Sequence, residues 1–301
     1  YRRLRQPPRA SEKDMKVLVT GATGVVGRQV VAQLLDAGAE VRAVTRDPAR
    51  AGLPGEVEVV TGDLTDPASL APAFAGVDRM YLFPVEEAVD EVVARAVAAG
   101  VERIVDLSAA SVTVGLHVNP VEAAVEKSGA AWTHVRPGSF MANMLPVWGP
   151  MIRAGREVRY PFAEEASVPV HEADIAAVAV AALLEDGHDG KVYTLTGPAA
   201  ITTREQVAAI GAALGEEVAY VEVSREEARE ILRAQGGFAA GAADLLLGFV
   251  DYDGGEPTGA DGYAEQDWSA LLRPWPGVPD ATGRPARDFA AWARDHVADF
   301  R

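Results

Sequence analysis

Cysteine is absent from the 301-residue chain. Its absence excludes disulfides, thiolate nucleophiles and thiolate metal sites. Long hydrophobic runs are also missing, and without a stretch of about 18 apolar residues the sequence predicts no membrane-spanning helix. Positive charge is scarce, because 28 lysines and arginines stand against 44 acidic residues, which gives a formal net charge of −16. Such a surface repels nucleic-acid phosphates and anionic lipids, so neither nucleic acid nor membrane is expected as a partner.

The first 14 residues also lack something, the apolar middle segment of a signal peptide. They hold five basic residues and a Pro-Pro pair, so we interpret residues 1–14 as a tail ahead of Met15. A cytoplasmic protein is expected. Apolar residues, in contrast, are plentiful at 49%, enough for a substantial core. At this length we expect one large domain with a smaller appended lobe.

Short apolar segments alternate with amphipathic ones through the first half of the chain. Strands are predicted at 16–20, 40–45, 57–61, 79–83, 102–108 and 131–136, and helices at 24–37, 85–99 and 120–128. This alternation predicts an α/β fold with a doubly wound parallel sheet and a ligand at the carboxyl ends of its strands.

After Arg136 the rhythm changes. Strands are predicted at 158–162, 191–196 and 217–223, and helices at 173–185, 204–214, 225–234 and 284–300. We interpret residues 151–301 as mainly a substrate-binding lobe, part of which returns to the sheet. The segment 236–262, rich in Gly, Ala and Leu, is either a mobile cover over a pocket or a plain surface helix and loop.

Three glycines, Gly21, Gly24 and Gly27, follow the first strand in the segment VLVTGATGVVGR. The first allows a tight turn, the second lets the backbone approach a pyrophosphate, and the third lets the helix pack against the strand. The helix N-terminus then offers free N–H groups and a partial positive charge to phosphates. The alternative is that the glycines serve only a tight turn. The strand–loop–helix setting favours a dinucleotide site within residues 15–150, formed by Gly21, Thr23, Gly24, Val25, Val26 and Gly27.

The residues after the second predicted strand indicate whether the cofactor is NADPH or NADH, and those after the third are candidates for binding its adenine. Thr45 occupies the position where an acidic residue would bind the ribose of NAD, and Arg46 follows it. An arginine there accommodates the 2′-phosphate of NADPH, so the sequence predicts NADPH, with NADH as the alternative. Asp63 and Leu64 follow the third strand, where a carboxylate can accept a hydrogen bond from adenine. The competing role for Asp63 is to bind backbone N–H groups of its own turn.

Five segments together, VTGATGVVG, VTRDP, GDLTDPASL, ERIVDLSA and SGAAWTHVRPGSFMANML, resemble the NmrA-like branch of atypical short-chain dehydrogenases. The resemblance runs from about Met15 to about Leu195. It implies a Rossmann domain with a small C-terminal substrate lobe, and either an NAD(P)H-dependent quinone or aryl reductase or a redox-sensing regulator without turnover. The residues that it implies near the nicotinamide and its ribose are Phe83, Pro84, Ser108, Pro137, Gly138, Ser139 and Phe140.

The catalytic pair of ordinary short-chain dehydrogenases, Tyr-x-x-x-Lys, is missing. Residues 108–127 contain no tyrosine, and Lys127 falls at the far end of its helix. Ser108 and His117 are the candidate polar groups for catalysis, and an imidazole can donate a proton near neutral pH. Their alternatives are a loop cap for Ser108 and a surface position for His117. A quinone also needs no strong acid, because water can protonate its phenolate product.

An apolar and aromatic cluster follows the sixth strand. Phe140, Met144 and Trp148 are predicted to contact a flat hydrophobic substrate, with a place in the core as the alternative. His171 is predicted to face the same cleft, with a structural role as the alternative. The histidines and carboxylates show no metal-site spacing, so no metal is predicted.

The sequence therefore predicts hydride transfer from NADPH to a quinone or other conjugated carbonyl. The high Ala, Arg and Gly content suggests a GC-rich genome, and by analogy the substrate is an aromatic polyketide intermediate of secondary metabolism. The rival hypothesis is a non-enzymatic dinucleotide sensor that binds a partner protein. An epimerase or dehydratase ranks last, because it needs the missing Tyr/Lys pair even more. The sequence leaves the oligomeric state open.

Overall fold

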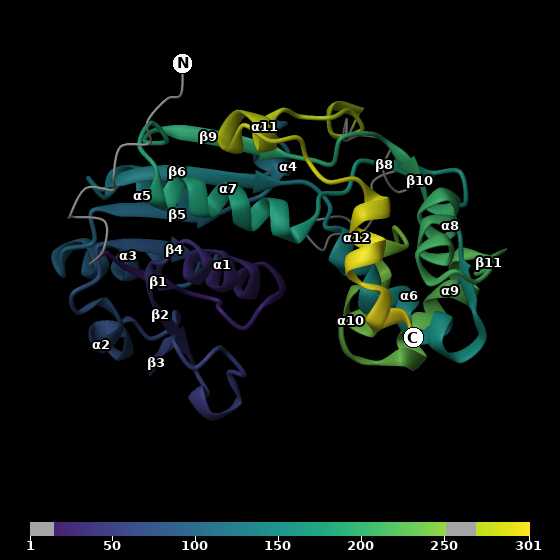
Figure 1. Ribbon diagram of the computed structural model, residues 1–301, viewed down its shortest axis with the longest axis horizontal. Coiled ribbons are helices and arrows are strands. Elements are labelled where there is room, and N and C mark those ends of the chain that lie inside the picture. The colour runs from purple at the N-terminus through teal and green to yellow at the C-terminus, as the bar shows by residue number, and fades with distance from the viewer. Residues whose placement is uncertain (1–14, 251–268) are drawn as a thin grey trace, which may run out of the picture.

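The computed structural model describes residues 15–250 and 269–301, so the predicted tail and most of the second half of segment 236–262 lie outside the described residues. A parallel sheet with strand order β3-β2-β1-β4-β5-β6-β9 forms the larger lobe (Figure 1). The order reverses between β1 and β4, which is where a doubly wound sheet binds its ligand. The predicted α/β fold is confirmed. The strands are β1 (Lys16–Val19), β2 (Glu40–Thr45), β3 (Glu58–Thr61), β4 (Arg79–Leu82), β5 (Arg103–Leu107), β6 (Ala131–Pro137) and β9 (Lys191–Leu195).

Helices cover both faces of this sheet, which is why its strands are apolar runs rather than alternating patterns. Val17 and Val19 of β1 pack on one face, and Leu18 between them packs on the other. The first face carries α1 (Val25–Asp36), α7 (Glu172–Leu184) and α11 (Gly277–Thr282) (Figure 1). The second carries α2 (Ala71–Phe74), α3 (Val89–Ala98) and α5 (Pro120–Lys127).

A smaller lobe has its own core, in which Trp148, Phe289, Trp292 and Phe300 are buried. The chain passes between the lobes repeatedly, because α7, β9 and α11 return to the sheet after parts of the small lobe have been built (Figure 1). The small lobe contains α6 (Met144–Gly155), β7 (Glu157–Tyr160), β8 (Ala166–Ser167), β10 (Ile201–Thr202), α8 (Thr203–Leu214), β11 (Ala219–Glu222), α9 (Arg225–Gln235), α10 (Gly237–Leu246) and α12 (Phe289–Asp295). Every helix in the described ranges is too short or too polar to cross a bilayer.

The terminal helix differs from its prediction. The apolar spacing predicts one helix over 284–300, whereas α12 begins only at Phe289 and gives way to a 3₁₀ turn at Val297–Phe300. The start is set by Asp288, whose backbone is extended and whose Oδ1 accepts a hydrogen bond from the N–H of Ala291 at 2.7 Å. A side-chain cap of this kind fixes the first turn of a helix.

Helix α6 is absent from the predictions. Pro146 and Pro150 interrupt its sequence, and proline normally argues against a helix interior. Pro146 falls in the first turn, where its missing N–H costs nothing. Pro150 is tolerated within the helix, whose buried side carries Val147, Trp148 and Ile152 against the small-lobe core.

Candidate functional site

The glycine loop has the geometry that its spacing predicts. Gly21 has a φ of +62°, and a Cβ there would lie 2.9 Å from the Phe83 side chain. A Cβ on Gly27 would lie 2.1 Å from the carbonyl oxygen of Gly21, so the close packing of α1 on this loop requires glycine. Gly24 is the residue before α1 and brings no capping side chain, which leaves the helix N-terminus open to a ligand.

Thr20 is a contributor that sequence reasoning missed. Its buried hydroxyl donates to the carbonyl of Tyr81 at 3.0 Å and accepts from the N–H of Phe83 at 2.7 Å. These bonds join the ends of β1 and β4 exactly where the strand order reverses, so they hold Phe83 against Gly21. A threonine directly before the first glycine of the loop is the only sequence signal for this role.

The glycine loop opens onto a cavity of about 270 Å³, here called the nucleotide cavity. Six predicted cofactor residues meet in it, and they come from the four separate loops that follow β1, β2, β3 and β4. The structure also adds Thr45, Thr65 and Val85, which sequence reasoning did not assign. The predicted residues that line the cavity are Gly21, Thr23, Arg46, Asp63, Leu64 and Phe83. Val25 is exposed beside them, while Val26 and Gly27 are buried beneath the loop.

Charge in the nucleotide cavity comes from Asp63 and Arg46. Asp63 Oδ1 accepts from the N–H and the hydroxyl of Thr65, at 3.0 and 2.9 Å, so the predicted turn role is present. These bonds, and then the charge of Arg46, lower the pKa of Asp63. Arg46 is exposed and forms no ion pair with any residue of the described ranges. Its guanidinium is therefore available to an anionic group at the rim.

A second cavity of about 170 Å³, here called the aromatic cavity, lies between the end of β6 and the small lobe. Four predicted residues line it: Ser139, Phe140, Met144 and Trp148. For Trp148 the sequence left two roles open, substrate contact and a place in the core. The structure is consistent with both, because Trp148 lines the cavity while only 2% of its surface is exposed. The residues that sequence reasoning missed here come from distant segments: Tyr160, Phe162, Glu165, Ala166, Ser167, Pro169, Thr203, Gln206 and Leu246.

Ser108 lies at the end of β5 but is 8% exposed and already engaged. Its oxygen accepts from Asn119 Nδ2 at 2.9 Å, and its hydroxyl donates to Glu122. His117 is half-buried in the loop before α5. Both lie outside the described linings of the nucleotide and aromatic cavities, so their catalytic roles stay predictions. Pro84, Pro137 and Gly138 also lie outside both described linings. Pro137 ends β6, and the N–H of Gly138 donates to the carbonyl of Leu195, at the end of β9, at 2.8 Å.

A buried polar group under α5 is the main feature that the sequence did not reveal. Glu122 forms two hydrogen bonds with Arg136, at 2.8 and 2.6 Å. Next to it, Asp106 Oδ1 lies 2.6 Å from His134 Nδ1, and both side chains are fully buried. Ligand atoms of Asp106, Glu122 and His134 lie within 4.8 Å of one another. Each carboxylate already has a partner, since Asp106 pairs with His134 and Glu122 with Arg136. Asp106 and His134 are register partners on β5 and β6, which local patterns do not show.

His171 lies away from both cavities described so far. It is 2% exposed, and its Nδ1 accepts from the N–H of Ala173 at 3.1 Å, so it caps α7. Its Nε2 lies 3.3 Å from Asp295 of α12. The adjacent Glu172 lies 2.6 Å from His296 Nε2. These contacts join the start of α7 to the end of α12, so the geometry gives His171 a structural place, and its substrate role stays a prediction without support from this placement.

This junction predicts a pH dependence of stability. Burial alone would raise the pKa of Glu172, but its interactions with the neighbouring His171 and His296 side chains lower it to about 2. Burial alone would lower the pKa of His296, but its bonds to Glu172 and Asp299 raise it. The His296 contribution is therefore present below its unfolded pKa of about 6.5 and is lost as pH rises through the folded value. His296→Gln should remove about 1 kcal/mol of stability at pH 6 and progressively less towards pH 9.

Urea unfolding of both proteins at pH 6, 7, 8 and 9 measures this difference. His117→Gln is the matched control, since that histidine lies outside the α7–α12 junction. A loss from His296→Gln that stays constant across this range would contradict the assignment.

A family model described as the NmrA-like family matches residues 13–243, more than half of the chain. The chain belongs to the NmrA-like family. The resemblance drawn from the sequence motifs is thereby confirmed, and the Rossmann fold agrees with the solved structures of similar proteins.

Two curated relatives resemble this NmrA-like chain over nearly its whole length. One is (4-alkanoyl-5-oxo-2,5-dihydrofuran-3-yl)methyl phosphate reductase of Streptomyces griseus, 39% identical over 94% of this chain and 99% of its own. The other is NAD(P)H azoreductase of Xenophilus azovorans, 34% identical with the same coverage of both chains. Among solved structures, the NADPH-dependent quinone oxidoreductase of Escherichia coli is 27% identical, with a TM-score of 0.70, covering 93% of this chain and 98% of that one.

Proposed function

We propose that this protein is an NADPH-dependent reductase that transfers hydride to a quinone or another conjugated carbonyl compound. The observation that carries the proposal is the nucleotide cavity at the switch point of the sheet, where the glycine loop and Arg46 meet. The aromatic cavity begins at Ser139 and Phe140, after β6, at the same edge of the sheet. A cofactor held by the loop would thus extend along this edge towards an apolar pocket.

The residues present fit NADPH. Gly21, Gly24 and Gly27 leave the backbone and the α1 N-terminus open to the pyrophosphate, and a Cβ at Gly27 would close that cradle. Arg46 would hold the 2′-phosphate, and Asp63 would accept from the adenine amino group with the carboxylate oxygen that Thr65 does not use. The named relatives point the same way, since one is an NAD(P)H azoreductase and one structure is an NADPH-dependent quinone oxidoreductase.

The aromatic cavity favours an uncharged, electron-poor substrate. Phe140, Met144 and Trp148 supply apolar walls, and the one charged residue among its described lining residues is Glu165. The Streptomyces griseus relative is named for a phosphate ester whose ring carries a double bond conjugated to carbonyl groups. The conjugated acceptor suits this cavity, whereas a phosphate would meet Glu165 and no cation from the described lining. We therefore propose a neutral conjugated carbonyl as the substrate, and a polyketide-type aromatic as one example.

When bound, NADPH supplies the hydride, which adds to the substrate while an electron pair moves to its oxygen. The protein's part is to position the ring and exclude water, which apolar walls do well. The new oxyanion takes one proton, which completes the reduction. Water or a polar group near the end of β5 supplies this proton, with Ser108 and His117 as the proposed groups.

The first test is a steady-state assay of NADPH oxidation with a panel of naphthoquinones and anthraquinones. Saturable loss of reduced-nicotinamide absorbance supports the reductase. Tight binding of both NADPH and NADP⁺ without turnover of any panel member would instead support the dinucleotide sensor. Weak or absent binding of both cofactor forms would contradict both proposals.

Arg46→Ala separates NADPH from NADH. Loss of the charged contact to the 2′-phosphate should weaken NADPH binding about 10- to 50-fold and change NADH binding less than about twofold. Titrations of both cofactors by fluorescence measure this ratio. Arg50→Ala is the matched control, because Arg50 is also exposed after β2 but lies outside the described lining of the nucleotide cavity. Equal losses for the two cofactors would disprove the role of Arg46.

A further inference from the structure

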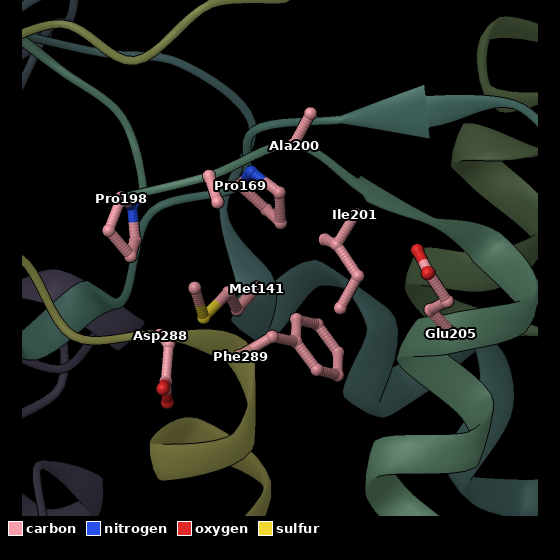
Figure 2. Close-up of a pocket in the computed structure, with 9 residues that line it drawn as sticks. Met141, Pro169, Pro198, Ala200, Ile201, Glu205, Asp288 and Phe289 are labelled. Carbon is pink, nitrogen blue, oxygen red and sulfur yellow. The ribbon is translucent and has the colours of Figure 1, made fainter.

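A third cavity, of about 330 Å³, lies on the α12 side of the small lobe and has no part in the proposed reaction. Its volume falls within the range of about 300–1,000 Å³ that is common for small-molecule sites. Figure 2 shows how residues from distant segments converge on it. We call it the Phe289 cavity, and its lining residues are Met141, Pro169, Pro198, Ala199, Ala200, Ile201, Glu205, Asp288 and Phe289.

A short backbone ladder separates this cavity from the aromatic cavity. Phe140 pairs with Val170 in an isolated bridge. The N–H of Met141 donates to Val170 at 3.0 Å, and the N–H of Val170 donates to Ser139 at 2.8 Å. Ser139 and Phe140 line the aromatic cavity, whereas Met141 lines the Phe289 cavity, and Pro169 borders both. The two cavities therefore lie on opposite sides of one thin wall.

The Phe289 cavity combines an apolar floor with two negative charges. Met141, 1% exposed, and Phe289, 4% exposed, lie at its centre, between Asp288 on one side and Glu205 on the other (Figure 2). The backbone N–H and the hydroxyl of Thr202 lower the pKa of Glu205 by hydrogen bonding. The nine described lining residues include no lysine, arginine or histidine to offset this charge.

The nearest arginines along the chain are turned to other carboxylates. Arg204, beside Glu205, pairs with Glu164 at 2.9 Å. Arg287, beside Asp288, pairs with Asp174. Both arginines are thus paired with other carboxylates, and no cationic side chain among the described residues forms an ion pair with Glu205 or Asp288. An anion is repelled there, whereas a cation gains attraction from both carboxylates and from the face of an aromatic ring.

We propose that the Phe289 cavity is a second binding site, which takes a small organic cation with an apolar body and a protonated or quaternary amine. The apolar body packs on Met141, Ile201 and Phe289, and the amine lies towards Glu205 or Asp288. This site goes beyond the proposed reductase activity. Because its wall is shared with the aromatic cavity through Pro169, an occupant is placed to stiffen that wall.

Calorimetric titration of the full chain with benzyltrimethylammonium tests the proposal, with and without saturating NADPH. Saturable binding with a Kd of about 1 mM or below is expected in both cases. Phenylmethanesulfonate, which has the same ring and the opposite charge, should bind at least about tenfold more weakly. Quinones that occupy the aromatic cavity should not displace the cation.

Two charge-removing substitutions keep the helix caps and so preserve the fold. Glutamine can take the place of glutamate in a capping box, and asparagine caps a helix N-terminus as well as aspartate does. The double variant Glu205→Gln/Asp288→Asn should weaken cation binding about tenfold or more, whereas Glu217→Gln, an exposed carboxylate outside the lining, should leave it unchanged. Absent saturation, equal binding of the sulfonate, displacement by quinones, or an unchanged Kd in the double variant would each overturn the proposal, whether or not the protein reduces quinones.

Discussion

Gly27→Ala should weaken NADPH binding by more than about 100-fold. The new Cβ would lie 2.1 Å from the carbonyl oxygen of Gly21 and 2.9 Å from the Cα of Ala22. Both neighbours are backbone atoms, so the contact cannot be relieved by a side-chain rotation. Helix α1 must move away from the loop, which takes its N-terminal N–H groups away from the pyrophosphate. Overpacking of this kind also costs about 1–3 kcal/mol of unfolding free energy.

The measurement is NADPH affinity by fluorescence titration, with the free energy of unfolding from urea denaturation of the same samples. Gly55→Ala is the matched control, since a Cβ at that position meets nothing within 4 Å and should change neither quantity. Gly24→Ala is a graded comparison, because its Cβ would lie at the tighter but tolerable distance of 3.3 Å from Gly21. Wild-type affinity in folded Gly27→Ala would disprove the role of this loop.

Arg136→Met should lower the free energy of unfolding by about 3–5 kcal/mol at pH 7. The substitution removes both hydrogen bonds to Glu122, whose side chain is 8% exposed, and leaves a buried carboxylate without its counter-charge. Burial alone would raise the pKa of Glu122, and at present the bonds from Arg136 and Ser108 lower it. Without Arg136 the carboxyl group protonates more easily, so the loss should shrink as pH falls below about 5.

Urea denaturation at pH 7 and pH 4 measures both parts of this prediction. The double variant Glu122→Met/Arg136→Met should lose less stability than Arg136→Met alone, because no charge is left unpaired. Arg95→Met, which breaks the exposed pair with Glu91, should change stability by no more than about 1 kcal/mol. If Arg136→Met cost no more than Arg95→Met, the buried pair would have no special energetic role.

Short-range sequence patterns, such as apolar runs and turn residues, predicted the elements that neighbouring residues determine. The first five strands of the sheet lie within a few residues of their predicted bounds, because each is a short apolar run closed by a turn. The residues of the nucleotide cavity could also be predicted from the sequence, because parallel strands bring the residues that follow them to one edge of the sheet. Gly21, Arg46 and Asp63 are far apart in sequence and meet there.

The parts that escaped prediction depend on pairings between distant segments. Asp106 and His134 sit inside strands that appear merely apolar, and only the register of β5 against β6 makes them partners. The aromatic cavity was half predicted, because Phe140 and Met144 follow β6 directly, whereas Tyr160, Phe162 and Glu165 belong to later segments. His171 was predicted to face the substrate cleft from its position before a helix. Its ring instead caps α7 and faces Asp295 of α12, a contact between distant segments that the sequence does not show.

The repeated passage of the chain between the lobes has an evolutionary consequence. The small lobe is built from separate stretches, and α7 and β9, which lie between them in sequence, belong to the large sheet. A single recombination event therefore cannot transplant the small lobe intact into another reductase. The lining of the aromatic cavity is accordingly distributed over separate stretches of the chain, so its shape can change by substitutions in any one of them while the sheet that holds the glycine loop stays the same.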